Sequence, residues 1–127
     1  MGSTVHNRIL ILEDDTALLT LFAKVFEKEG FEAKCVETLA AANESLKRHP
    51  YDVLVCDLSV VGGVNAFAYL VPLLAAKPKM RILIISGYIP DNIPAEAATN
   101  NVEIMEKPFA PADLVKRVTV LIESRAA

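Results

Sequence analysis

Five polar residues lie at or just after the ends of short apolar runs, and their types suit one chemistry. They are Glu13, Asp14, Asp57, Ser86 and Lys107. Two carboxylates about 4 Å apart repel each other by roughly 4 kcal/mol at an effective dielectric near 20, so carboxylates gather only beside a cation or a proton. Carboxylate oxygens select Mg²⁺, Mn²⁺ or Ca²⁺ over soft metals. Because Mg²⁺ commonly combines one or two carboxylates with phosphate oxygens, the pattern indicates metal-assisted phosphoryl transfer.

Asp57 is the candidate nucleophile, because a carboxylate can attack a phosphoryl donor and form an aspartyl phosphate. A bound metal ion and the Lys107 ammonium would neutralise charge on the group being transferred. The Ser86 hydroxyl would donate a hydrogen bond to a phosphoryl oxygen. The sequence therefore offers a nucleophile, two metal-binding acids and two groups that would hold the phosphoryl oxygens.

The apolar runs predict five β-strands, each about four residues long and mostly rich in Val, Ile or Leu. The runs are Ile9–Leu12, Ala33–Val36, Val53–Cys56, Ile82–Ile85 and Val102–Met105. Continuous apolar runs without polar alternation are typical of strands that are covered on both faces. The central strands of the sheet are therefore expected to be buried.

Stretches with helical periodicity separate the strands and span approximately residues 16–29, 39–48, 65–76, 95–99 and 111–124. Gly30 is expected to stop the first helix, Thr38 to cap the second, and Pro111 to begin the last. Alternating strands and helices predict a parallel sheet with helices on both faces. Five such units fit an α/β, doubly wound, flavodoxin-like fold with strand order 2-1-3-4-5 and five flanking helices.

In this fold, ligands bind outside the carboxyl ends of the strands, where the strand order reverses. The reversal lies between the first and third strands, so Glu13, Asp14 and Asp57 should converge there, beside the residues that follow the fourth and fifth strands. Each residue also has an ordinary structural interpretation; Asp14 or Asp15, for example, could cap the first helix. Their coincidence at the corresponding ends of four strands favours the functional interpretation.

The composition limits the classes of protein to which this chain can belong. The 127 residues are 53% hydrophobic with a net charge of −3, which fits one globular domain and offers no basic patch for nucleic acid.

Cys35 and Cys56 would lie about 10 Å apart, judged from the spacing between strands, so we expect no disulfide between them and two buried free thiols. The uncharged stretch 58–76 is interpreted as a loop and a helix rather than a membrane span. Residues 1–7 lack the apolar core of a signal peptide and are expected to be disordered or tag-like.

These motifs resemble those of response-regulator receiver domains, the phosphorylated modules of two-component signalling, over residues 8–125. Residues 9–15 resemble the first strand and acidic pair of the family, and residues 51–58 resemble its phosphoacceptor segment. Residues 82–88 resemble the segment that carries a hydroxyl, and residues 106–109 the lysine-proline signature. The resemblance implies the same doubly wound fold.

The resemblance also implies roles for the site residues. Asp57 would be the phosphoacceptor. Asp14 and Asp57 would bind Mg²⁺ directly, the Ser59 backbone carbonyl would be a third ligand, and Glu13 would act mainly through water. Ser86 and Lys107 would contact the phosphoryl group. These assignments come from the family and not from the spacing of the residues.

The family further implies a histidine kinase or a histidine phosphotransfer domain as the phosphoryl donor. A receiver domain catalyses its own Mg²⁺-dependent phosphorylation and dephosphorylation, so it is a cytoplasmic signalling phosphoprotein, often part of a phosphorelay, and not a metabolic enzyme. The peptide bond between Lys107 and Pro108 is expected to be cis, an arrangement nearly confined to X–Pro bonds.

Four positions depart from the family pattern. Val60 and Val61 replace the usual Met-Pro pair, Asn65 replaces the glycine that opens the third helix, and Ile104 replaces the usual aromatic switch residue. Tyr88 is a candidate for part of that switch role. Because the charged residues of the site are retained, the departures concern the output surface more than the chemistry.

Two other functions follow from these departures and from the fold. The first is a pseudo-receiver, a protein interaction module that is not phosphorylated. The second is a flavin-binding protein, which would need a phosphate-cradling loop after the first strand, where this chain has Glu13, Asp14 and Asp15. The uncharged helix 65–76 is in addition a hypothetical contact surface for a second copy or a partner domain.

Overall fold

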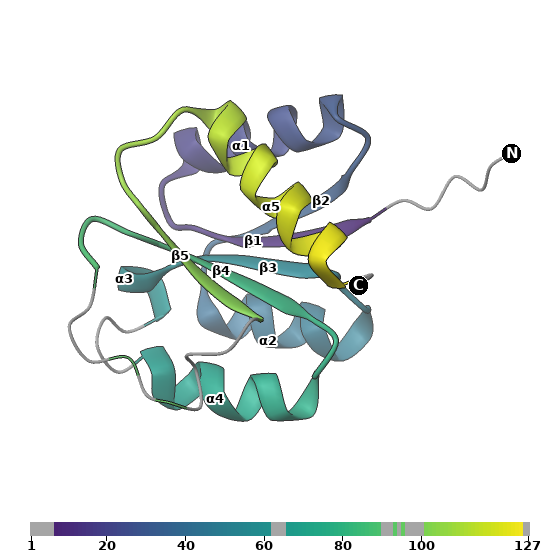
Figure 1. The fold of residues 1–127 in the computed structure, drawn as a ribbon, viewed down its shortest axis with the longest axis vertical. Coiled ribbons are helices and arrows are strands. Elements are labelled where there is room, and N and C mark those ends of the chain that lie inside the picture. Colours follow the sequence, from purple (N-terminus) through teal and green to yellow (C-terminus); the bar gives the residue numbers. More distant parts are fainter. Residues whose placement is uncertain (1–6, 62–65, 90–92, 94, 96–100, 126–127) are drawn as a thin grey trace, which may run out of the picture.

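The computed structural model describes residues 7–61, 66–89, 93, 95 and 101–125. These residues contain a five-stranded parallel sheet in the order β2-β1-β3-β4-β5, with helices on both faces (Figure 1). The strands are β1 Arg8–Leu12, β2 Glu32–Val36, β3 Val53–Asp57, β4 Arg81–Ser86 and β5 Val102–Glu106. The predicted fold class and strand order are confirmed, and each strand extends the predicted run by one or two residues.

The described helices are α1 Thr16–Lys28, α2 Leu39–Arg48, α3 Leu58–Val61, α4 Ala66–Ala76 and α5 Pro111–Arg125. Four of them match predicted helices to within one residue at each end. The sequence did not predict α3, because four residues are too few to show a 3.6-residue period. Of the helix expected at residues 95–99, only Ala95 is among the described residues. Asn65 also lies outside them.

Two hydrophobic layers enclose the sheet, one on each face. Helices α1 and α5 cover one face, where Phe26 and Val118 are fully buried against Ile11 of β1. Helices α2, α3 and α4 cover the other face, where Leu46 and Leu70 pack in one cluster with strand residues. Figure 1 shows α1 and α5 together on one side of the strands and α2 and α4 on the opposite side. Side chains alternate between faces along each strand, so the sheet is shared by two separate clusters.

Local signals in the sequence set the helix ends. The carboxylate of Asp15 accepts hydrogen bonds from the backbone N–H groups of Ala17 at 3.0 Å and Leu18 at 3.2 Å, so Asp15 is the N-cap of α1. The Thr38 hydroxyl accepts from Ala41 at 3.1 Å and caps α2, as predicted. Gly30 follows α1 with φ of 91°, a left-handed conformation that favours glycine.

The two cysteines differ in environment. Cys56 lies in β3 and is fully buried, and burial raises the pKa of its thiol to about 12, so it is not a reactive thiolate. Cys35 is only half-buried, which corrects the expectation that both thiols are buried. The reason is its place in β2, an edge strand in which exposed and half-buried residues alternate. Both cysteines are free.

Helix α4 carries the uncharged sequence that was considered as a contact surface. Its exposed residues are small, namely Ala68, Pro72, Ala75 and Ala76. The Tyr69 hydroxyl donates a hydrogen bond to Asn43 Oδ1 at 2.6 Å, which ties α4 to α2. The large exposed apolar side chains recorded for the described residues lie elsewhere. Within the described part of the chain, no helix has the length and apolar character needed to cross a membrane. The contact-surface hypothesis stays a prediction.

Burial predicts a clear difference between two leucines. Leu54 of β3 is fully buried, whereas Leu21 of α1 is 42% exposed. Leu54→Ala should lower the free energy of unfolding by about 2–5 kcal/mol, because it removes buried methyl groups and leaves a cavity. Leu21→Ala, the matched control, should change it by no more than about 0.5 kcal/mol. Urea unfolding measures both, and equal losses would contradict the two-layer core.

Candidate functional site

Strand register brings the predicted site residues to one edge of the sheet. Leu12 of β1 pairs with Cys56 of β3, so the next residues, Glu13 and Asp57, leave neighbouring strands at the same level. Ser86 is the last residue of β4 and pairs with Glu106 of β5, directly before Lys107. The backbone N–H of Lys107 donates to the Ser86 carbonyl at 2.7 Å, which fixes the start of its loop.

The Asp57 carboxylate is held on both of its oxygens. Lys107 Nζ donates to Oδ2 at 2.6 Å, and both the N–H and the hydroxyl of Ser59 donate to Oδ1, at 2.9 and 2.5 Å. Asp57 is only 5% exposed. Burial by itself would raise the pKa of the Asp57 carboxyl, but the bonds from Lys107 and Ser59 outweigh it and hold the pKa below its ordinary value of 3.8. Asp57 is therefore an ionised, fully hydrogen-bonded carboxylate.

Glu13 is the second buried acid of the site and is 3% exposed. Its Oε2 accepts a hydrogen bond from the Asp15 N–H at 3.2 Å. Its Oε1 is buried, has no hydrogen-bond partner among the described residues, and lies 3.7 Å from Lys107 Nζ. Burial raises the pKa of Glu13, and the neighbouring charge of Asp57 raises it further, whereas the Asp15 N–H and Lys107 act in the opposite direction. Glu13 is thus an acid whose charge is incompletely compensated.

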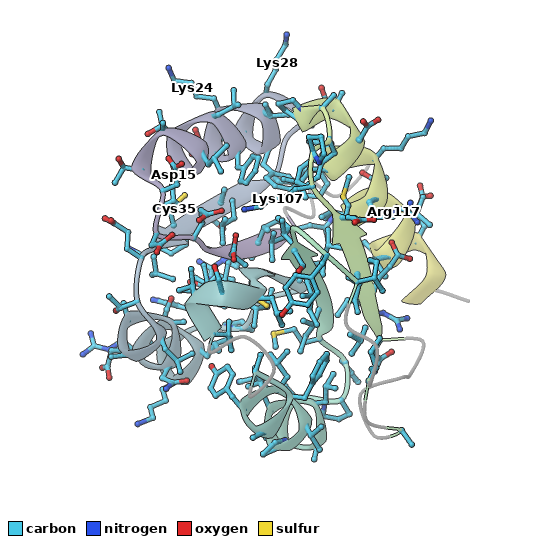
Figure 2. All side chains as sticks on the ribbon, turned by 90° about the vertical axis from the view of Figure 1, so that its left-hand side faces the viewer. Asp15, Lys24, Lys28, Cys35, Lys107 and Arg117 are labelled. Carbon is cyan, nitrogen blue, oxygen red and sulfur yellow. The ribbon has the colours of Figure 1, made fainter. Side chains whose placement is uncertain are left out.

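Lys107 is the cation that joins the two acids. Figure 2 shows its side chain pointing into the centre of this end of the molecule, whereas Lys24 and Lys28 of α1 project outward. Burial would lower the pKa of Lys107, but the hydrogen bond to Asp57 and the charges of Asp57, Glu13 and Asp14 together raise it. The ammonium group therefore stays protonated beside the carboxylates.

The loop that carries Lys107 is anchored on α1. The Lys107–Pro108 peptide bond is cis, as predicted. The next residue, Phe109, stacks on Phe22 of α1 with ring centroids 6.1 Å apart and planes inclined by 19°. This contact was not predicted from the sequence.

The remaining predicted residues border the same edge. Asp14 is exposed; side-chain hydrogen bonding with it contributes to raising the pKa of Glu13, and its charge contributes to raising the pKa of Lys107. Ser86 is 3% exposed, and its Oγ accepts a hydrogen bond from the Tyr88 N–H at 3.2 Å. Tyr88 is 51% exposed. Ile104, at the position where the family has an aromatic residue, is half-buried in β5.

The residues fit a hard divalent cation, although the side chains do not form a finished cage. Among the described residues, no group of three or more His, Cys, Asp or Glu side chains is arranged so that it could hold a metal ion. Mg²⁺ needs only one or two carboxylates and completes its shell with water, carbonyl or phosphate oxygens. The unpartnered Oε1 of Glu13 beside an exposed Asp14 meets that requirement.

Ser59 has a role that sequence reasoning missed. It was expected to contribute only its backbone carbonyl, yet its N–H and hydroxyl both bind Asp57. A serine two residues after an aspartate is a recognisable signal, because Asp side chains often accept hydrogen bonds from the backbone and side chain two residues on. Because Asp57 was interpreted only as a residue at the end of a strand, its local hydrogen bonds with Ser59 were not considered.

Comparison with known proteins gives the same family for sequence and fold. The model of the response regulator receiver domain matches residues 9–119. The chain is 26% identical over 116 residues to the response regulator receiver protein CpdR of Brucella abortus, which covers 91% of this chain and 96% of CpdR. It is 31% identical over 80 residues to the photosynthetic apparatus regulatory protein RegA of Rhodobacter capsulatus, covering 63% of this chain and 43% of RegA. The chain thus spans less than half of RegA.

Solved structures extend the match to nearly the whole chain. A response regulator receiver protein from Sinorhizobium medicae aligns with a TM-score of 0.77 and 27% identity, covering 97% of this chain and 99% of that one. A CheY-like receiver domain protein from Methanospirillum hungatei aligns with a TM-score of 0.83 at 20% identity, covering 96% and 98%. The family match over residues 9–119 shows that this chain belongs to the response regulator receiver domains of two-component signal transduction.

Proposed function

We propose that the domain accepts a phosphoryl group on Asp57 from a histidine kinase or a histidine phosphotransfer domain, in an Mg²⁺-dependent reaction, and later removes the group itself. The observation that carries this proposal is the buried, ionised Asp57 carboxylate with Lys107 Nζ at 2.6 Å and the buried acid Glu13 beside it. Because apolar residues often stabilise a fold as well as a buried ion pair does, this charged cluster favours a chemical role over a structural one.

Each residue has a role that its position supports. Asp57 is the nucleophile because it lies at the end of a buried strand with its pKa held low. Lys107 neutralises charge on the incoming phosphoryl oxygens, and Ser86 donates to one of them through its hydroxyl proton. Asp14, Asp57 and the Ser59 carbonyl would hold a bound Mg²⁺, and Glu13 would act on it through water. The ion would polarise the phosphoryl oxygens.

The alternative is a pseudo-receiver that binds partners without being phosphorylated. Ile104 in place of an aromatic residue favours a different output, but it does not remove any group from the acidic edge. The domain would act in the cytoplasm, where its kinase partner presents the phosphohistidine. A contact through the exposed small residues of α4 with a second copy or a partner domain belongs to the same proposal.

Phosphorylation of Asp57 is directly testable by intact mass. With Mg²⁺ and acetyl phosphate, the wild type should gain one phosphate-sized increment, and Asp57→Asn should gain none because an amide is a poor nucleophile. Asp52→Asn is the matched control. Asp52 directly precedes the first residue of β3, at the end of the strand opposite Asp57, and its carboxylate accepts a hydrogen bond from the Arg8 N–H. This variant should gain the same phosphate-sized increment as the wild type. A wild type without any gain would favour the pseudo-receiver.

The metal assignment predicts a stability response that separates two neighbouring acids. Mg²⁺ at 100 times its dissociation constant should raise the free energy of unfolding by about 2.7 kcal/mol if only the folded state binds it. Asp14→Asn should remove most of this increase. Asp15→Asn should keep it, because Asp15 caps α1 and asparagine caps equally well. Thermal unfolding with Mg²⁺ and with a chelator measures the response; an unresponsive wild type would contradict the metal site.

Glu13 predicts a pH dependence in the metal-free protein. Its pKa is raised above the ordinary value of 4.5, so its ionised form destabilises the fold. The penalty is absent below pH 4.5 and grows as the pH rises through the raised pKa. Glu13→Gln should therefore be more stable than the wild type near pH 7, and the gap should shrink toward pH 4.

Urea unfolding in the presence of a chelator measures this gap at both pH values. Glu44→Gln is the matched control, because the Glu44 side chain is 57% exposed, and its substitution should give a small difference at either pH. A Glu13→Gln gap of the same size at pH 4 and pH 7 would show that the buried charge is not its source.

A further inference from the structure

Asp57 carries hydrogen bonds in the resting protein that differ in how readily they can be released. The Ser59 N–H belongs to the first turn of α3, so it is fixed by the backbone. The Ser59 hydroxyl turns about one side-chain bond, and Ser59 is exposed. At 2.5 Å, its contact with Oδ1 lies in the range of strong O–H···O⁻ bonds. The hydroxyl is therefore a strong but removable donor.

Phosphoryl transfer changes the value of that hydrogen bond. An oxygen of Asp57 forms the bond to phosphorus while the bond between phosphorus and the leaving group breaks, and the leaving group departs with the electron pair. The carboxylate loses its negative charge in this step, so Oδ1 becomes a much weaker acceptor. An interaction made with the reactant and weakened in the transition state raises the barrier.

We propose that the Ser59 hydroxyl is a removable cap on Asp57, which slows phosphoryl acceptance in the resting domain and turns away when the group is transferred. The inference rests on the proposed function and deepens it by naming a group that controls the reactivity of the nucleophile. The cap acts on the carboxylate itself and is separate from the Ser59 carbonyl assigned to the metal.

Ser59→Ala removes the hydroxyl and leaves the backbone donor in place. With saturating Mg²⁺ and a series of acetyl phosphate concentrations, intact mass gives the rate of phosphate gain. The saturating rate constant should rise about tenfold in Ser59→Ala, because a hydrogen bond to a charged group is lost from the ground state. The concentration of half-saturation should stay the same, since Ser59 bonds the nucleophile and not the donor.

Two further variants separate the cap from a general effect on the fold. Ser59→Thr retains a hydroxyl and should restore a rate close to that of the wild type. Ser45→Ala removes a serine of α2 whose Oγ lies 2.5 Å from the Tyr51 hydroxyl, outside the site, and should leave the rate unchanged. Rescue by threonine is not expected if Ser59→Ala acts only by loosening α3.

The outcomes distinguish this inference from the proposed function. Equal rates in the wild type, Ser59→Ala and Ser59→Thr would overturn the cap while leaving Asp57 phosphorylation in place. A slower Ser59→Ala would also overturn it, because the hydroxyl would then assist the transfer. A wild type that gains no phosphate at any donor concentration would overturn both proposals.

Discussion

The ammonium group of Lys107 is paired with two buried carboxylates at the carboxyl end of the sheet. Lys107 Nζ lies 2.6 Å from Asp57 and 3.7 Å from Glu13, and both acids are almost completely buried. One positive charge beside two negative ones leaves the edge short of cations, so Glu13 remains poorly compensated. The proposed divalent cation would supply the positive charge that this arrangement lacks, and the proposed transfer of a negatively charged phosphoryl group would need the same charge.

The sequence predicted the positions of these groups better than their contacts. Glu13, Asp57 and Ser86 lie at strand ends, and the direction and order of parallel strands follow from the alternation of apolar runs with helical stretches. The caps at Asp15 and Thr38 are encoded by neighbouring residues, so they too were accessible. The cis bond before Pro108 was expected only from the resemblance to the family, because a proline permits a cis bond without requiring it.

Contacts that depend on a rotamer or on distant packing were not predicted. The hydroxyl of Ser59 could have pointed to solvent, and only the folded geometry shows that it binds Asp57. The stack of Phe109 on Phe22 joins residues from opposite ends of the chain. The half-burial of Cys35 follows from the position of β2 at the sheet edge, although its place in a predicted strand run suggested a buried thiol.

The site is supported by two hydrophobic layers, which form separate clusters of described residues on the two faces of the sheet. Lys107 is anchored through Phe109 to the layer of α1 and α5, whereas Ser59 begins the segment that packs through Leu58 and Val61 into the layer of α2 and α4. Asp57 lies between them and is bonded to both. If Asp57 is phosphorylated as proposed, the loss of its negative charge would weaken one bond to the layer of α1 and α5 and one to the layer of α2 and α4, so a single event would reach both faces of the sheet.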